Sequence, residues 1–165
     1  MHDANTAAQI IDVSMDCVGW RAVEGLEALA HSVIAACVRE AGLPVPKKFE
    51  VSLLFCDDAE IRSLNKAWRG KDCATNVLSF PIPASRTKTP RVMLGDIIIA
   101  FQTTAGEAER DGKSLRNHTA HLIAHGFLHL IGYDHLQEVE AETMENAERR
   151  ILHSLGIADP YLTSA

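Results

Sequence analysis

The chain has 165 residues and a net charge of −6, with 47% hydrophobic and 23% charged residues, which is typical of one soluble globular domain. No apolar run approaches the roughly 20 residues of a membrane-spanning helix, and residues 1–8 lack the basic, apolar pattern of a secretion signal. The four cysteines form no C-x-x-C pair, which argues against a disulfide scaffold or a zinc knuckle. We therefore expect a single cytoplasmic domain over 1–165, with loose ends at 1–8 and 157–165.

The negative net charge argues against general nucleic-acid binding, but the charges are unevenly placed along the chain. Between Arg62 and Arg91 there are seven basic residues and one acid, Asp72, so the local charge is +6. Between Glu138 and Glu148 there are five glutamates and no basic residue, so the local charge is −5. A protein with this asymmetry can bind a polyanion on one side only. On charge alone, two solvated faces are an equally good interpretation.

Apolar residues with alternating or helical periodicity predict strands and helices in a mixed order. Glycines and prolines between the periodic stretches mark the turns. We expect the glutamates of the last helix to face outward. Taken along the chain, the expected elements are a strand at 9–14, a helix at 22–40, a strand at 49–56, a helix from Asp57 or Asp58 to about Trp68, strands at 76–82 and 94–101 (the latter interrupted at Gly95-Asp96), and helices at 102–110, 114–131 and 136–155.

The order of these elements predicts the fold class. Helices fit between the first and second strands and between the second and third, whereas no helix fits between the third and fourth. Strands three and four should therefore be antiparallel neighbours. The prediction is an α+β domain: a mixed sheet of about four strands with one antiparallel strand, packed with about five helices, and a metal site on a helix and the turn that follows it.

Three closely spaced histidines, His125, His129 and His135, carry the metal-site prediction. His125 and His129 are four residues apart on an expected helix, so they share one face. Gly132 can adopt the left-handed conformation that ends a helix and reverses the chain, which would bring His135 back toward the other two. A lone histidine on an apolar face is usually a hydrogen-bonded core residue. Three at this spacing instead indicate a catalytic zinc site with an open fourth position.

The spacing matches the metzincin signature H-E-x-x-H-x-x-G-x-x-H, but Gly126 replaces the glutamate that is the general base of those peptidases. The sequence thus keeps the ligands of a metallohydrolase without the base of a protease. Ligation by nitrogen alone favours one zinc ion over magnesium or calcium, and nickel or cobalt could substitute for it. Zinc would bring the pKa of a bound water toward ~7 and so provide hydroxide at neutral pH.

Three further residues are candidates for supporting roles. His121, one turn before His125, could orient a ligand or approach the substrate, and a core or rim histidine is an equal alternative. Asp134 precedes His135 and could orient a ligand, or it could cap the turn. Arg69 is expected in a polar, glycine-containing loop at 68–72, where its planar guanidinium would suit a phosphate, although a surface arginine is the simpler interpretation from this residue alone.

Four motifs in order along the chain together resemble the YbeY family, bacterial metal-dependent endoribonucleases of rRNA maturation. The resemblance covers about 49–156. Asn76 stands where many members carry aspartate, and Trp68 where another aromatic residue, often tyrosine, is usual. The motifs are Leu64-Asn65 with Trp68-Arg69-Gly70-Lys71-Asp72, then Thr75-Asn76-Val77-Leu78-Ser79-Phe80-Pro81, then Leu94-Gly95-Asp96-Ile97, and finally the segment from His125 to His135.

The resemblance implies a fold of about four strands and several helices, with one zinc ion held by the three histidines. It implies action on single-stranded rRNA, in trimming the 3′ end of small-subunit rRNA and in clearing defective ribosomes. The implied partners are the small ribosomal subunit and its assembly proteins, with no membrane and no DNA. It also implies that Arg69 matters for activity.

Two alternatives remain open from the sequence. One is a metzincin-like metallopeptidase whose base lies elsewhere, against which both Gly126 and the basic segment argue. The other is a non-catalytic ribosome-assembly factor stabilised by a metal, although structural zinc sites usually have four protein ligands. The sequence does not decide between a metal-bound hydroxide and a 2′-hydroxyl as the nucleophile, and it shows no clear general base.

Overall fold

The computed structural model describes residues 8–83, 91–134 and 136–162. Four strands form one mixed sheet in the order β1-β2-β4-β3. The strands are β1 (Gln9–Met15), β2 (Phe49–Cys56), β3 (Val77–Pro81) and β4 (Val92–Ala100). β1 pairs with β2 and β2 with β4 in parallel, whereas β3 pairs with β4 in antiparallel orientation at the edge. The predicted α+β class and the antiparallel third and fourth strands are confirmed.

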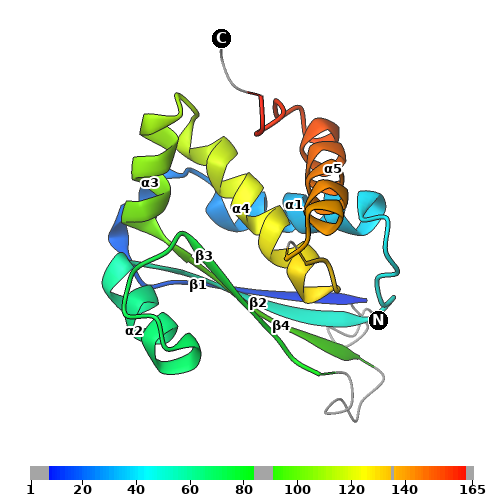
Figure 1. Cartoon of the computed structure of the whole chain (residues 1–165), viewed down its shortest axis with the longest axis horizontal. Coiled ribbons are helices and arrows are strands. Elements are labelled where there is room, and N and C mark those ends of the chain that lie inside the picture. Colours follow the sequence, from blue (N-terminus) through cyan, green and yellow to red (C-terminus); the bar gives the residue numbers. More distant parts are fainter. Residues whose placement is uncertain (1–7, 84–90, 135, 163–165) are drawn as a thin grey trace, which may run out of the picture.

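Helices cover both faces of this sheet (Figure 1). The helices α1, α4 and α5 contact one another on one face, and α4 also contacts β3 and β4. α2 lies on the opposite face, against β4. The helices are α1 (Leu26–Glu40), α2 (Asp58–Arg69), α3 (Phe101–Arg110), α4 (Leu115–Leu130) and α5 (Glu138–Ser154), with a short 3-10 helix, η2 (Val18–Ala22), before α1. None of the helices in the described ranges combines the length and the apolar character needed to cross a lipid bilayer.

The side chains of β4 point alternately to the two faces of the sheet, which explains how one sheet supports two cores. Ile97 and Ile99 join the main core beneath α1, α4 and α5, while Ile98 and Ala100 join a smaller one beneath α2. Successive side chains of a strand point to opposite faces, so a strand covered on both sides is apolar throughout. This is why 94–101 is so apolar in the sequence.

Most predicted elements differ from the structure by only one or two residues at an end, and two differences are larger or of another kind. The first long helix begins at Leu26 instead of residue 22, because Gly25 has a φ of +66° and the chain before it forms η2, whose Trp20 donates from Nε1 to Cys56 O at 2.9 Å. β4 continues through Gly95-Asp96, where an interruption was expected. The irregularity there is a register shift between Glu50 and Val51 of β2 in their pairing with β4.

The C-terminal tail was expected to be loose from residue 157, and its described part is anchored instead. Ile157 packs against the main core. Lys113 Nζ donates to Pro160 O at 2.7 Å, and Arg149 Nε donates to the Asp159 carboxylate at 3.1 Å. Tyr161 reaches the carboxylate of Glu148. The apolar and charged partners of this tail are distant in sequence, so their proximity could not be read from the tail alone.

Gly126 sets how closely α4 approaches the sheet. A methyl group on it would lie 2.7 Å from Ile97 Cγ2 and 3.2 Å from Ser79 Oγ. Ser79 Oγ donates to the carbonyl oxygen of Gly126 at 3.1 Å, which ties β3 directly to the helix. A larger residue would have to push α4 away from β3 and β4.

We expect Gly126→Ala to destabilise the protein by about 1–3 kcal/mol, because overpacking at the helix–sheet contact outweighs the better helix propensity of alanine. The measurement is urea denaturation followed by circular dichroism. Gly106→Ala is the matched control: it also lies in a helix, but apart from its chain neighbours and the nearby backbone of its own helix no atom lies within 4 Å of its added methyl group. This control should gain roughly 0.5–1 kcal/mol. Equal effects of the two substitutions would refute the close-packing argument.

Candidate functional site

His125 and His129 form an imidazole pair on one face of α4. Their Nε2 atoms are 3.0 Å apart, and the ring centroids are separated by 4.6 Å. His125 Nδ1 contacts Glu148 Oε1 at 2.5 Å, and His129 Nδ1 contacts Tyr133 O at 3.0 Å. His135, the third predicted ligand, lies outside the described residues. The structure therefore brings two of the three predicted ligands together.

The partners of the two Nδ1 atoms determine which tautomers fit. A carboxylate and a carbonyl oxygen only accept hydrogen bonds, so each Nδ1 carries the hydrogen and each Nε2 presents a lone pair. Two lone pairs facing each other at this distance repel unless a cation lies between them. Two ligands of one tetrahedral zinc ion, each at about 2.0–2.1 Å, would be roughly 3.3 Å apart. The two nitrogen donors therefore suit such an ion. Among the described residues, no further His, Cys, Asp or Glu side chain joins them to form a three-ligand group.

Glu148 of α5 is the residue that orients His125, and this role was not predicted from the sequence. The glutamates of α5 were all expected to face outward, yet Glu148 is completely buried. Burial raises the pKa of its carboxyl, but hydrogen bonds from His121 and His125 outweigh burial and hold the pKa at about 2. A buried carboxylate that accepts from a ligating imidazole fixes its orientation and raises its basicity.

A signal for Glu148 was present in the sequence. The buried face of α5 consists of Met144, Ala147, Glu148, Ile151 and Leu152, which follow the i, i+3, i+4 pattern of an inward stripe. The glutamate stands within that stripe, whereas exposed Glu142 of the same helix does not. A carboxylate on a core-facing stripe requires a buried partner. The periodicity therefore marks Glu148 as a residue with a specific role.

His121 and Tyr161 surround the other side of the Glu148 carboxylate. His121 Nε2 lies 3.4 Å from Glu148 Oε2 and 3.3 Å from the Tyr161 hydroxyl, and that hydroxyl donates to Glu148. Burial and the nearby carboxylate both raise the pKa of Tyr161, so it stays a hydrogen-bond donor. The ring centroid of His121 is 6.4 Å from that of His125. This geometry fits a supporting position for His121 behind His125.

A cleft of about 800 Å³ lies beside the imidazole pair. It is bounded by the edge strand β3, the loop that follows α2, and the end of α4 with its turn, where Gly132 has a positive φ of 114°. Asp134, the other predicted supporting residue, lines the cleft as well. The polar and charged side chains of its wall include Asn65, Arg69, Lys71, His125, His129 and Asp134.

Arg69 enters this cleft from the last turn of α2. Its Nη2 donates to Ser79 O at 3.0 Å, and its guanidinium lies 5.7 Å from the centre of the Phe80 ring. Since Ser79 Oγ is bonded to Gly126 O, a short chain of contacts links Arg69 to the imidazole-bearing helix. The predicted phosphate-binding arginine and the predicted ligand pair thus face one cavity, although α2 and α4 lie on opposite faces of the sheet.

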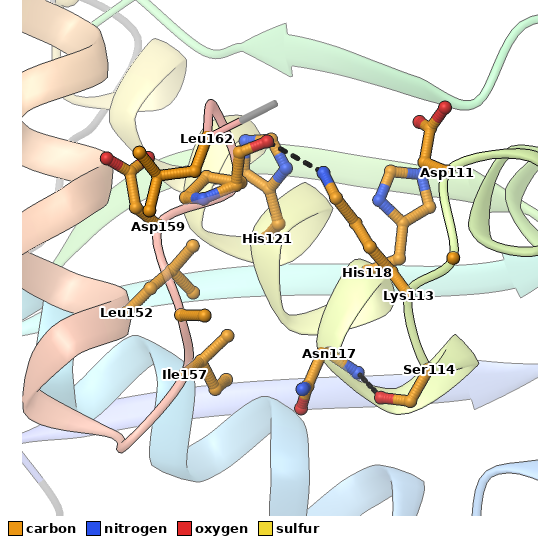
Figure 2. A pocket seen from close by; sticks show the side chains of 13 residues that line it. Asp111, Lys113, Ser114, Asn117, His118, His121, Leu152, Ile157, Asp159 and Leu162 are labelled. Carbon is orange, nitrogen blue, oxygen red and sulfur yellow. Dashed lines mark hydrogen bonds between the residues drawn. The ribbon is translucent and has the colours of Figure 1, made fainter. Parts of the chain in front are cut away.

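A second cavity, of about 500 Å³, shares no lining residue with the cleft. Figure 2 shows it between the start of α4 and the C-terminal tail, with His118 and His121 on one wall and Leu152 and Ile157 on another. His118 Nε2 lies 3.2 Å from Glu107 Oε1, whose carboxylate also accepts from Asn76 at 3.0 Å. The amide of Asn76 suits this position, because an aspartate would repel Glu107. These contacts brace the start of β3 against α3 and α4.

The fold and the cleft together define a hydrolase domain centred on a helix-borne imidazole pair. The chain belongs to the family described as Endoribonuclease YbeY, whose family model matches residues 19–156. It is 50% identical over 152 residues to the Endoribonuclease YbeY of Methylocella silvestris, covering 92% of this chain and 85% of that protein. It is likewise 50% identical over 161 residues to the Endoribonuclease YbeY of Agrobacterium fabrum, covering 94% of this chain and 96% of that protein. The family resemblance seen in the sequence is confirmed.

A solved structure shares the fold. The solution structure of TM1509 from Thermotoga maritima aligns with a TM-score of 0.56, covering 93% of this chain and 99% of that chain. At 21% identity this likeness shows the fold alone.

We expect Glu148→Gln to weaken zinc binding by about 10–100-fold, because an amide neither holds the His125 imidazole in place nor raises its basicity as a carboxylate does. The measurement is competition for zinc with a coloured chelator. Glu142→Gln is the control, since it makes the same change on an exposed position of the same helix. Equal zinc affinity of both variants would contradict the role given to Glu148.

Proposed function

We propose that this protein is a zinc-dependent endoribonuclease that acts on single-stranded rRNA, in 3′ end maturation of the small-subunit rRNA and in ribosome quality control. The observation that carries the proposal is the convergence of an imidazole pair and a guanidinium on one cleft, in a chain whose relatives are named Endoribonuclease YbeY. The proposal includes a cytoplasmic setting and, as partners, the small ribosomal subunit and its assembly proteins.

The metal would be held by His125 and His129 through Nε2, with His135 as the third ligand. Neutral imidazoles favour zinc, and nickel or cobalt could substitute for it. When bound, the ion supplies Lewis-acid chemistry: it polarises a phosphoryl oxygen and increases the acidity of a nucleophilic hydroxyl or water. Glu148 contributes by keeping the His125 ring in the orientation and tautomer that direct Nε2 toward the cleft.

Arg69 is proposed as the catalytic residue. One of its nitrogens, Nη2, donates to Ser79 O, and this bond fixes the plane of the guanidinium while other N–H groups remain to bind phosphate. A planar guanidinium can donate to two oxygens of a phosphate and stabilise the charge that grows in the transition state. Lys71 lines the same cleft and adds a positive charge for the flanking backbone. Asp134 is proposed to orient the metal ligands from the turn.

The cleft favours a single strand as substrate. Its volume falls within the roughly 300–1,000 Å³ of sites that enclose one small ligand. Such a space accommodates an unstacked nucleotide but not a duplex, and unstacked bases are what proteins recognise in single-stranded RNA.

The packing of Gly126 bears on one form of the metallopeptidase alternative, in which the base is a glutamate at this position. A side chain here would run into Ile97 and Ser79, so a glutamate could not occupy it with the present packing of α4. A peptidase base would have to act from another position, and the casein experiment below tests that form of the alternative. The non-catalytic assembly factor is distinguished by the first experiment below.

Arg69→Ala should lower the rate of RNA cleavage by about 100-fold or more while zinc stays bound, because a donor to the transition state is lost. His129→Ala should lose both cleavage and zinc. The measurements are cleavage of a single-stranded rRNA fragment and zinc content of each purified protein. Arg39→Ala, the same substitution at an exposed position of α1 outside the cleft lining, is the control and should keep most activity.

All variants are purified identically, so that a contaminating nuclease would appear equally in each. Cleavage by Arg69→Ala at the wild-type rate would refute its catalytic role. RNA binding without cleavage by any of the proteins, including wild type, would favour the assembly factor. Cleavage of casein would favour the peptidase.

Removal of the metal should abolish cleavage reversibly. After treatment with a chelator and dialysis, we expect no cleavage, with recovery on addition of zinc but not magnesium, because nitrogen ligands hold magnesium poorly. The measurement is RNA cleavage before and after each addition, with metal content determined in parallel. Full activity of the metal-free protein would contradict the proposed mechanism.

A further inference from the structure

Trp68 is a large aromatic side chain that the fold leaves in solvent. It is 73% exposed, whereas Trp20, the other tryptophan of the chain, is fully buried. On α2 it continues the inward stripe of Ile61 and Leu64 at positions i, i+3 and i+7. Ile61 packs beneath the helix, but β3 is the edge of the sheet, so no further strand among the described residues covers the indole.

The indole is held beside the cleft by its neighbours. Its ring centroid lies 6.4 Å from that of Phe80, with the planes at 60°. Phe80 faces the α2 side of β3, while the adjacent Ser79 faces α4. The Arg69 guanidinium spans the edge between them, since it is bonded to Ser79 O and lies 5.7 Å from the Phe80 ring. Trp68 thus lies next to Arg69 on the α2 side of β3, outside the residues that line the cleft.

The charges around Trp68 indicate the chemistry of its partner. Lys66, Arg69 and Lys71 are all exposed on or just after the last turn of α2. Asp72, the only acid between residues 62 and 83, is paired with Arg62 at 2.8 Å. An exposed aromatic face surrounded by positive charge is complementary to a polyanion that carries aromatic groups, which is a single-stranded nucleic acid. An anionic lipid surface also attracts an indole flanked by basic residues, but only a nucleic-acid strand also fits the adjacent cleft that Arg69 and Lys71 line.

We propose that Trp68 is a stacking platform for one nucleobase of the RNA strand whose phosphate is bound by Arg69. This inference rests on the proposed function and identifies a base-binding subsite for it. The indole offers a face to any base, so it contributes affinity without strict sequence preference, and Lys66 and Lys71 bind the flanking phosphates. Phe80 holds the ring at the edge of the sheet, so that little side-chain freedom is lost when a base stacks.

The fluorescence of Trp68 provides a direct test with the whole protein. Zinc is removed first, so that RNA is bound without being cleaved. Oligouridylate should quench the tryptophan emission, whereas an abasic oligonucleotide of the same length, with the same phosphates but no bases, should not. Trp20 is buried and contributes a constant background. Trp68→Phe should remove the quenching while keeping binding, because the phenyl ring still stacks.

Kinetics of the zinc-loaded protein provide a second readout. Trp68→Ala should raise KM for a single-stranded RNA by roughly tenfold and leave kcat within about twofold, since stacking binds the strand without touching the reacting atoms. Trp68→Phe should restore most of the affinity. Val18→Ala is the matched control, since Val18 is 69% exposed and lines none of the cavities described above. Circular dichroism melting verifies that each variant is folded.

The outcomes separate this inference from the proposed function. If wild type cleaves RNA but Trp68→Ala has an unchanged KM, the platform is refuted and the function stands. If oligouridylate quenches Trp68 but wild type cuts no RNA, the platform stands and the catalytic proposal fails. Equal quenching by the abasic strand would show that phosphates alone are bound, and this result would overturn the inference.

Discussion

The contact between α4 and the edge of the sheet is the constraint on which the candidate site depends. Gly126 allows the helix to lie against Ile97 and Ser79 without an intervening side chain. Because the helix is this close, the imidazoles of His125 and His129 open onto the same cleft as Arg69. A helix held farther away would separate the nitrogen donors from the guanidinium, and the two halves of the site would lie in different cavities.

The same contact explains how the metallopeptidase pattern of histidines could serve a different chemistry. The position that carries the base in that pattern is Gly126 here, which packs closely against Ile97 and Ser79. The charged group in the cleft instead comes from α2, on the far face of the sheet, and is fixed through the backbone of β3. A fixed cation beside a metal suits a phosphodiester, whose transition state accumulates negative charge, better than it suits a peptide.

Behind the imidazole pair, polar contacts centred on the Glu148 carboxylate connect α4, α5 and the C-terminal tail. Glu148 accepts from His125, His121 and Tyr161, and it lies in a fully buried position. A buried carboxylate is costly unless its oxygens are hydrogen-bonded, and these three groups satisfy both oxygens of Glu148. The long helix after the site and the short tail beyond it therefore belong to the site as much as the histidine motif does.

The sequence by itself determined the order of the elements, the antiparallel edge pair and the family, because periodicity, capping residues and motif spacing are local properties of the chain. It also singled out His125, His129 and Arg69 as residues to examine. Only the tertiary structure decided that Arg69 and the imidazoles share a cleft, that Glu148 points inward and that the tail is anchored. These facts depend on contacts between residues as much as 47 positions apart, such as Ser79 with Gly126 and Lys113 with Pro160. Such contacts are fixed by how helices pack on a sheet, which no local pattern records.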